Sequence, residues 1–339
     1  MYQVAGSDSS PPDISALKDA RTAEEFYDAR YREGYMVDDD WSAEKLRRVE
    51  TLIRELGLPP KGRALDFGCG QGVFTAVLRK ALPSWEIHGT DISTDAMRLA
   101  QARLPDCKFH TLSECETIQS EFDFVFSHHV LEHVSDLPQT AGLIGHMLAP
   151  TGTMLHIMPC GNPGSFVHGI CLLRRDGIDT KAEHRFFYDE SGHLRRLTTE
   201  TLVNAGWGDR FNVKRAYYAN RTAGEIRSVT RFGLDFVLQF ADPSKAVNGS
   251  AAARLWLLRA FLVLVWALRK PADVVRNKLR SGCHGLRDVV LLGASFVLYP
   301  VAAAVNGLLD TLAAREWARH REDCRGSEMY VALSRATSN

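Results

Sequence analysis

The chain of 339 residues has no net charge, no CxxC pair and no zinc-finger or other nucleic-acid-binding motif. Its basic and acidic residues are equal in number, so no general attraction to a polyanion such as nucleic acid is expected. Its seven cysteines are odd in number, which favours free thiols in a reducing cytosol over a disulfide framework. The first fifteen residues contain neither a basic nor an apolar stretch. We therefore expect no signal peptide and a cytoplasmic protein.

Apolar strand-like segments alternate with helical ones through the middle of the chain. The expected strands are Arg63–Phe67, Glu86–Thr90, Lys108–Leu112, Phe122–Ser127 and Met154–Met158, followed by Phe211–Tyr217 and Met329–Ser334. This alternation predicts a doubly wound α/β fold, a Rossmann-like sheet with helices on both faces. We expect four segments: a leader with N-terminal helices (1–60), the core (61–218), a helical, partly apolar C-terminal insertion (219–325), and the final strand with a tail (326–339).

Three tyrosines recur at four-residue spacing in the expected N-terminal helix. Tyr27, Tyr31 and Tyr35 would lie on one helical stripe. Such a stripe is typical of a packed amphipathic face, which we prefer here. An aromatic lid over a ligand is the alternative.

A glycine-rich loop follows the first strand and precedes a helix. It reads Asp66-Phe67-Gly68-Cys69-Gly70-Gln71-Gly72, with glycines at alternate positions. Glycine lets the backbone turn sharply and approach a ligand closely. A dinucleotide-binding oxidoreductase is the competing interpretation, but its G-x-G-x-x-G pattern would need glycine where Val73 stands. The carboxylate of Asp66 would also repel a pyrophosphate, so we expect a ligand that has an ammonium group and no phosphate.

Asp91 ends the second strand, nineteen residues after Gly72. A carboxylate at this strand end can accept hydrogen bonds from both hydroxyl groups of a ribose. The alternative is a purely structural role at the start of a helix that is capped by Ser93 or Thr94. Together with the glycine loop, the ribose role is favoured.

These segments resemble the class I S-adenosylmethionine-dependent methyltransferases. LDFGCGQG, GTDIS, FDFVFSHHVLEHVSD, LAPTGTMLHIMP and TTETLVNAGW occur in the family's order, over roughly 63–217. The resemblance implies a seven-stranded sheet whose last strand is antiparallel, and it implies S-adenosylmethionine as cofactor. The cofactor is then expected near the glycine loop, the ends of strands two and four, and the segment after strand three, at Asp66, Gly68, Cys69, Gly70, Gly72, Asp91, Ile92, Ser113, Glu114, Ser127 and His128.

Methyl transfer needs an acceptor held in line and, for some acceptors, a base. His128 and His129 follow the fourth strand, and His184 belongs to a region that borders the acceptor pocket in related enzymes. We take these three histidines as the catalytic candidates. The spacing of His129, Glu132 and His133 would place three metal donors on one helical face, but we expect no metal. His133 is interpreted as a packing residue.

A basic, histidine-rich segment, Gly192-His193-Leu194-Arg195-Arg196, lies before the sixth strand. It could bind an anionic group, or it could form a solvated loop that leads into a helix. The sequence favours neither.

The C-terminal insertion contains two apolar runs, Leu255–Leu268 and Val289–Leu309, within a stretch rich in Arg and Lys. A single membrane crossing would leave the final strand on the wrong side of the bilayer. We therefore expect helices that lie on an anionic membrane surface through 254–309, or a buried helical cap. The sequence predicts methyl transfer to an oxygen of a small-molecule, lipid-linked or glycan acceptor. A catalytically inactive, membrane-associated partner that binds S-adenosylmethionine is the alternative.

Overall fold

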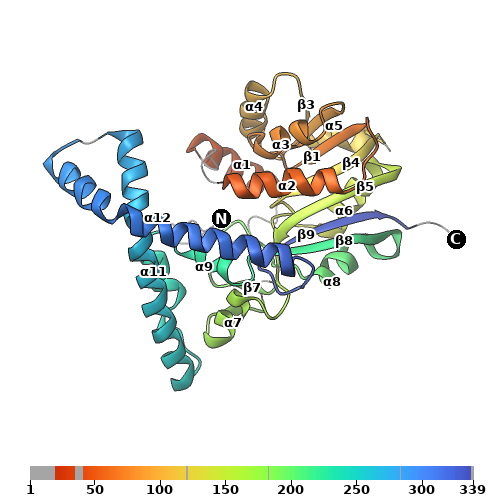
Figure 1. Cartoon of the computed structure of the whole chain (residues 1–339). Helices are drawn as coiled ribbons and strands as arrows, with labels where there is room; N and C mark the ends of the chain where they lie inside the picture. The colour runs from red at the N-terminus through yellow and green to blue at the C-terminus, as the bar shows by residue number, and fades with distance from the viewer. Residues whose placement is uncertain (1–19, 35–40, 120, 182, 283, 337–339) are drawn as a thin grey trace.

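The computed structural model describes residues 20–34, 41–119, 121–181, 183–282 and 284–336, and its centre is a seven-stranded sheet (Figure 1). The strand order is β3-β2-β1-β4-β5-β9-β8. The strands are β1 (Arg63–Phe67), β2 (Glu86–Thr90), β3 (Lys108–His110), β4 (Phe122–His128), β5 (Leu148–Pro159), β8 (Phe211–Ala219) and β9 (Glu328–Arg335). The doubly wound fold that the sequence predicts is confirmed.

The first five strands in chain order are parallel, and β9 is antiparallel to both of its neighbours. It lies between β5 and β8, with His156 opposite Val331. The last strand therefore inserts between β5 and the edge strand β8, although more than one hundred residues separate it from β8. Strand order reverses between β1 and β4, and ligands of doubly wound sheets bind in the crevice at this switch point.

Alternating side chains of the central strands pack into two separate cores. Phe124 and Phe126 point to one face, where α2 (Ala43–Glu55) and α3 (Val73–Ala81) cover the sheet. Val125 points to the other face, toward α6 (Leu137–Met147) and Trp207. The side chains of β4 alternate between the two faces of the sheet and are apolar on both. This pattern is typical of a strand that is buried on both sides.

The remaining core helices are short and connect the strands. They are α4 (Thr94–Arg103), α5 (Leu112–Thr117), α7 (Phe166–Leu173), α8 (Thr199–Leu202), the π-helical turn η3 (Val203–Trp207) and the 3-10 turn η4 (Gly208–Arg210). A two-stranded ribbon pairs β6 (Ile178–Asp179) with β7 (Arg185–Phe186). The N-terminal helix α1 (Ala20–Arg32) docks on α4, since Asp28 Oδ1 accepts a hydrogen bond from Ser93 Oγ at 2.5 Å. Tyr35 lies outside the described residues.

The third strand is shorter in the structure than the expected Lys108–Leu112. It ends at His110 because a helix begins at Leu112, with Thr111 as its N-cap in a capping box with Glu114. The two hydrogen bonds of the capping box satisfy backbone N–H groups at the start of the helix. In a strand that continued past His110, these groups would need other partners.

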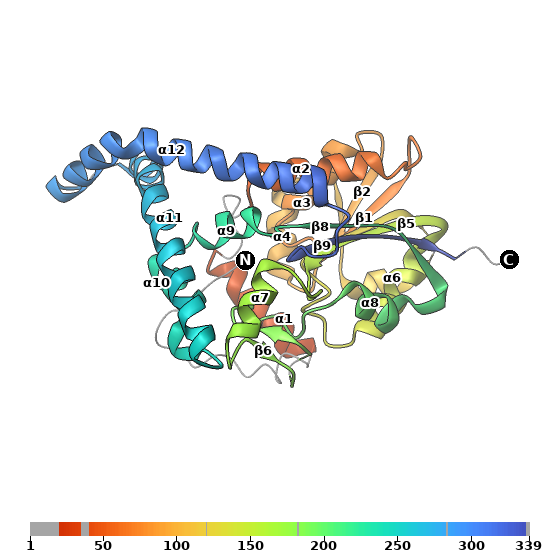
Figure 2. The same ribbon diagram turned by 60° about the horizontal axis from the view of Figure 1, so that its bottom comes forward.

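The chain from β8 to β9 forms a helical layer that extends beyond the sheet (Figures 1 and 2). It comprises α9 (Ala223–Val229), α10 (Leu234–Phe240), the turn η5 (Pro243–Lys245), α11 (Gly249–Ser281) and α12 (Leu286–His320). The start of α11 packs with α7 and α10 in a third apolar core. The end of α12 returns to the sheet, where the Trp317 ring lies 5.5 Å from that of Tyr330.

The helices α11 and α12 contain the two apolar runs. By length and composition alone both helices could cross a membrane, and buried core helices pass the same test. Only 22% and 11% of their most apolar stretches are buried, so they are not core helices. Seventeen of the twenty exposed large apolar side chains among the described residues lie in α11 or α12. Most of α11 and α12 is therefore exposed rather than buried as a cap.

Candidate active site

The glycine loop is held against the end of β2. The backbone N–H groups of Gly68 and Cys69 both donate to Thr90 O, at 2.8 and 2.9 Å. Gly68 and Gly70 have φ angles of +78° and +51°, a left-handed conformation that favours glycine. A Cβ on Gly68 would lie 2.2 Å from Val130 Cγ2, and one on Gly70 would lie 2.6 Å from the Tyr31 hydroxyl oxygen. The glycines therefore permit both the turn and the close approach of neighbouring segments.

Asp91 fixes the loop from the end of β2. Its Oδ2 accepts a hydrogen bond from Gly70 N at 2.8 Å, and its Oδ1 accepts one from Ser93 N at 2.9 Å. Burial raises the pKa of Asp91, although these backbone donors oppose the shift. Ser93 also caps α4. The structure therefore shows the structural role of this segment, and the ribose role of Asp91 stays a prediction.

A cavity of about 670 Å³ opens at the carboxyl ends of the parallel strands. One side is formed by Gly68, Gly70 and Asp91, and the opposite side by residues after β4, beginning with His128. The cavity is lined by Asp91, Asp136 and Glu190, and no lysine or arginine of the described residues lines it. This charge suits a cationic ligand better than a pyrophosphate.

Tyr27 and Tyr31 of α1 also line the cavity. Tyr27 Oη lies 2.8 Å from His133 Nδ1, and burial raises the pKa of both phenols. Tyr27 and Tyr31 therefore lie at the cavity, where the aromatic-lid alternative would place them. The sequence favoured a packed helical face instead. The tyrosines remain hydrogen-bond donors at neutral pH because their pKa values are raised.

His128 is held between two aromatic rings. It stacks on Phe74 at 3.8 Å and meets Trp41 edge-on at 4.5 Å between ring centroids. Burial, together with the nearby Lys45 and His129, lowers its pKa well below the usual value. Its Nε2 is buried and has no hydrogen-bond partner among the described residues. His128 is thus a neutral imidazole that lines the cavity and has a buried, unpaired Nε2.

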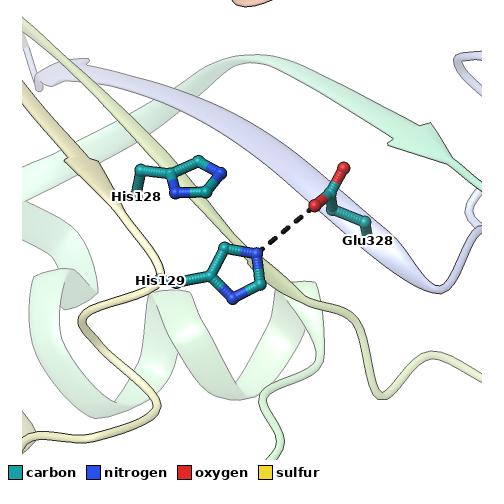
Figure 3. A group of neighbouring side chains, drawn as sticks. All are labelled: His128, His129 and Glu328. Atoms are coloured by element: carbon teal, nitrogen blue, oxygen red, sulfur yellow. Dashed lines mark hydrogen bonds and ion pairs between the residues drawn. The ribbon is translucent and has the colours of Figure 1, made fainter. Parts of the chain in front are cut away.

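His129 lies beside His128 and is held by carboxylates on two sides. It has a positive φ of 54°, which turns the chain away from β4. Figure 3 shows its ring directed at Glu328 of β9, with Nε2 at 3.4 Å from Oε1. Its Nδ1 lies 2.9 Å from Glu132 Oε1. Glu328 also forms an ion pair with Lys45.

Glu132 is fully buried and is surrounded by three histidines. Besides His129, the Nε2 atoms of His133 and His193 each lie 4.0 Å from its Oε1. Burial alone would raise its pKa, but the three imidazoles outweigh that effect and lower it to about 2. Residues 131–133 form a turn, so the single helical face expected for His129, Glu132 and His133 is wrong. The third histidine, His193, comes from a distant segment instead.

The cavity gathers about half of the predicted site residues: Gly68, Cys69, Gly70, Asp91, Ile92, His128 and His129 line it. Asp66 and Gly72 do not line it. Asp66 accepts a 2.6 Å hydrogen bond from Thr75 Oγ1, and burial raises its pKa to about 7. Asp66 therefore supports the loop from beneath rather than facing a ligand.

Four further predicted residues lie away from the cavity. Ser127 points to the opposite face of the sheet, where its Oγ lies 2.7 Å from His156 Nδ1. Ser113 and Glu114 are exposed on the first turn of α5. His184 is exposed on a turn, with a φ of 64°. None of these four residues lines the cavity, so their predicted roles have no geometric support.

The structure supports neither of the two alternatives for the basic segment 192–196, an anion-binding site or a solvated loop. Arg195 and Arg196 are buried. Arg196 pairs with Asp189 at 2.5 Å and Arg195 pairs with Glu183 at 2.5 Å. Their charges are therefore neutralised inside the protein, and the loop is not solvated.

The sequence did not identify Trp41 or Glu328 as site residues, and Glu132 was considered only as a metal donor that we did not expect to be used. Glu132 had a signal, since it lies between two histidine-rich positions in the segment after β4. Glu328 had none, because it reaches His129 only through the insertion of β9 beside β5.

Comparison with known proteins agrees with this geometry. A family model described as "Methyltransferase domain" matches residues 65–154. Trans-aconitate 2-methyltransferase of Variovorax paradoxus (strain S110) is 31% identical over 119 residues, which are 34% of this chain and 46% of that protein. The enzyme of the same name from Methylobacterium radiotolerans is 33% identical over 122 residues, 34% of this chain and 45% of that protein. The chain thus spans about half the length of the curated relatives it matches.

A solved structure of a Haemonchus contortus phosphoethanolamine N-methyltransferase aligns with 86% of this chain and 53% of its own. The identity is 14% and the TM-score 0.42, so the likeness is distant.

The fold, the glycine loop with Asp91 and the matched region at residues 65–154 are similar to those of class I S-adenosylmethionine-dependent methyltransferases. Residues 65–154 thus match a methyltransferase domain, and S-adenosylmethionine is the cofactor that this match implies. The residues present fit this cofactor, since the cavity joins close-approach glycines to acidic side chains.

Proposed function

We propose that the protein transfers the methyl group of S-adenosylmethionine to an oxygen of a small molecule bound in the same cavity. One observation carries this proposal: a single cavity joins the glycine loop and Asp91 to the histidines after β4. The cofactor supplies an electrophilic methyl group when bound. The matched relatives are named for methylation of a small molecule, trans-aconitate, which supports a small acceptor.

Some residues of the cavity bind the cofactor, and others orient the acceptor. The backbone of Gly68 and Gly70, with Asp91, holds the cofactor. His128 lines the cavity, is neutral and has an unpaired Nε2. A small rotation of the ring that exposes this buried nitrogen would let it accept a hydrogen bond from an acceptor hydroxyl. That bond would point an oxygen lone pair at the methyl group, which is the alignment that methyl transfer requires. His128 is therefore the residue that orients the acceptor.

The charge of the cavity indicates an acceptor unlike a tricarboxylate. No lysine or arginine lines the cavity among the described residues, whereas three acids do. Apolar side chains such as Val130, Leu112 and Leu143 form much of the remaining surface. A neutral, hydroxyl-bearing molecule with an apolar body fits this lining best. Lipid-linked and glycan acceptors can carry the same hydroxyl group.

The test is transfer of labelled methyl from S-adenosylmethionine into a cell extract that is then split into lipid and aqueous phases. Label in either phase supports methyl transfer, and the phase separates a lipid-linked acceptor from a water-soluble one. His128→Ala is expected to lower turnover about 100-fold, while His184→Ala leaves it unchanged because His184 is exposed and remote from the cavity. No label, with S-adenosylhomocysteine binding intact, would support the inactive partner instead.

We also propose that α11 and α12 lie on an anionic lipid surface. Their exposed apolar side chains include Leu257 (75% exposed) and Val297 (79% exposed). Arg254, Arg276 and Arg287 are exposed on the same two helices. An apolar surface edged with arginine matches the acyl chains and anionic headgroups of a bilayer interface.

Vesicles with and without phosphatidylserine test this second proposal. The double variant Leu257→Asp/Val297→Asp is expected to lose binding, whereas Leu172→Asp, at a residue 60% exposed outside these helices, is expected to retain it. Release of the wild-type protein from membranes by alkaline carbonate is also expected. Retention would indicate a spanning hairpin, and a wild-type protein that does not bind either vesicle would refute the proposal.

A further inference from the structure

The polar cluster around Glu132 resembles a metal site more than a structural ion-pair network. We propose that His129, Glu132 and His193 bind a divalent transition-metal ion, with Zn²⁺ the best match, at the acceptor side of the cavity. Binding of the ion is independent of the proposed methyl transfer, but its use in catalysis rests on that function.

The donor atoms are already close enough for one ion. His129 Nδ1 lies 2.9 Å and His193 Nε2 lies 4.0 Å from Glu132 Oε1, and the donors of the three residues lie within 4.8 Å of one another. A tetrahedral Zn²⁺ with bonds near 2.0–2.1 Å separates its donors by about 3.4 Å. Small side-chain shifts would therefore complete the coordination.

Glu132 itself indicates a missing cation. The residue is fully buried, and neither carboxylate oxygen has a well-aligned hydrogen bond among the described residues, despite the short approach of His129. A buried carboxylate without such bonds is costly, since it loses its hydration. A divalent ion between Glu132 and the imidazoles would compensate for that loss.

Each metal-binding histidine has a carboxylate at its other ring nitrogen. His129 Nε2 lies 3.4 Å from Glu328 Oε1. His193 Nδ1 lies 3.8 Å from Asp189 Oδ1, which is beyond hydrogen-bond distance, so a small shift of the ring would be needed to form this bond. Carboxylates in this position orient metal-bound imidazoles and make them better ligands.

The proposed ligand set leaves coordination positions open toward the cavity. Two histidines with one glutamate is a donor set of catalytic zinc sites, and both histidines line the cavity. The ion would supply the fixed positive charge that the lining lacks, and it would lower the pKa of a bound hydroxyl group. The acceptor hydroxyl loses its proton to solvent, its oxygen bonds to the methyl carbon, and the carbon–sulfur bond breaks to leave the neutral thioether. An acceptor with two adjacent oxygens would chelate the ion and bind best.

The test uses full-length protein without a histidine tag, stripped of metal and titrated with Zn²⁺ or Co²⁺. The wild-type protein is expected to bind one ion per chain and to give visible d–d absorption with Co²⁺. Glu132→Gln and His193→Gln are each expected to abolish the tight site. Glu328→Gln is expected to weaken it about 10–100-fold, since it removes only an outer partner. His146→Gln is the matched control for metal content, because His146 lines the cavity outside the cluster.

Affinity for S-adenosylhomocysteine shows whether each variant is folded. If the wild-type protein binds Zn²⁺ no more tightly than Glu132→Gln while both bind S-adenosylhomocysteine equally, the metal site is refuted and methyl transfer is unaffected. A wild-type protein that binds no ion at all refutes it even if the variants do not fold. Stoichiometric binding that depends on Glu132 and His193, in a protein without methyl transfer, would support the site and refute the proposed function.

Discussion

Replacing Gly68 by alanine is expected to destabilise the folded protein by about 2–5 kcal/mol. An L-residue in the left-handed conformation found here costs about 1–2 kcal/mol. The new methyl group would lie 2.2 Å from Val130 Cγ2, and overpacking of this kind costs about 1–3 kcal/mol more. Val130 precedes Glu132 by two residues, so relief of the clash would also move the segment that carries the histidines after β4.

Gly57 provides a matched control for the backbone contribution. Its φ is +70°, but a Cβ there would have no atom within 4 Å. Gly57→Ala should therefore cost only about 1–2 kcal/mol. In urea unfolding followed by tryptophan fluorescence, we expect Gly68→Ala to lose more stability than Gly57→Ala.

A double-mutant cycle separates the clash from the backbone strain. Val130→Ala removes the side chain that the new methyl group meets, so Gly68→Ala/Val130→Ala should recover about 1–3 kcal/mol relative to the sum of the single changes. Equal losses in Gly68→Ala and Gly57→Ala, or purely additive effects in the cycle, would refute the steric reasoning.

Two further predictions concern a buried histidine and the cofactor side of the cavity. Burial lowers the pKa of His156 to about 3, whereas the unfolded chain protonates it near 6.5, so its contribution to stability is lost as pH falls from 6.5 toward 3. When the pH falls from 7.5 to 5, the free energy of unfolding in urea should therefore drop by about 2 kcal/mol less for His156→Asn than for the wild type. An equal drop in both proteins would contradict the prediction. Asp91→Asn should weaken S-adenosylhomocysteine binding about 10–100-fold in calorimetry. Glu114→Gln should leave that affinity unchanged because Glu114 is exposed, and a comparable loss would restore its predicted role near the adenine.

The fold was predictable because its signals are local. The strands around Phe67, Thr90 and Phe124 are short apolar runs bounded by turns, and the structure forms them where the pattern indicates. The glycine loop was predictable for the same reason, since alternate glycines between a strand and a helix have few other uses. The extent of the third strand was wrong although its signal was also local: Thr111 and Glu114 form a capping box, which starts a helix.

The insertion was harder to interpret because hydropathy does not show which face of a helix is covered. The runs Leu255–Leu268 and Val289–Leu309 could equally form a buried cap or an exposed layer. Packing decides this: Leu255 and Leu262 are buried in the third core, while Trp256 and Leu257 remain exposed on the same helix.

The sequence by itself determined the doubly wound sheet, the cofactor loop and the position of Asp91, because each depends on residues that are near neighbours in the chain. Only the tertiary structure decided which polar groups meet. Glu328 reaches His129 across 199 positions because β9 inserts beside β5. His193 reaches Glu132 because the segment before α8 folds back under the cavity, where Leu194 N donates to Glu132 O at 2.9 Å. Contacts of this kind follow from strand order and loop packing, which no local pattern of residues encodes.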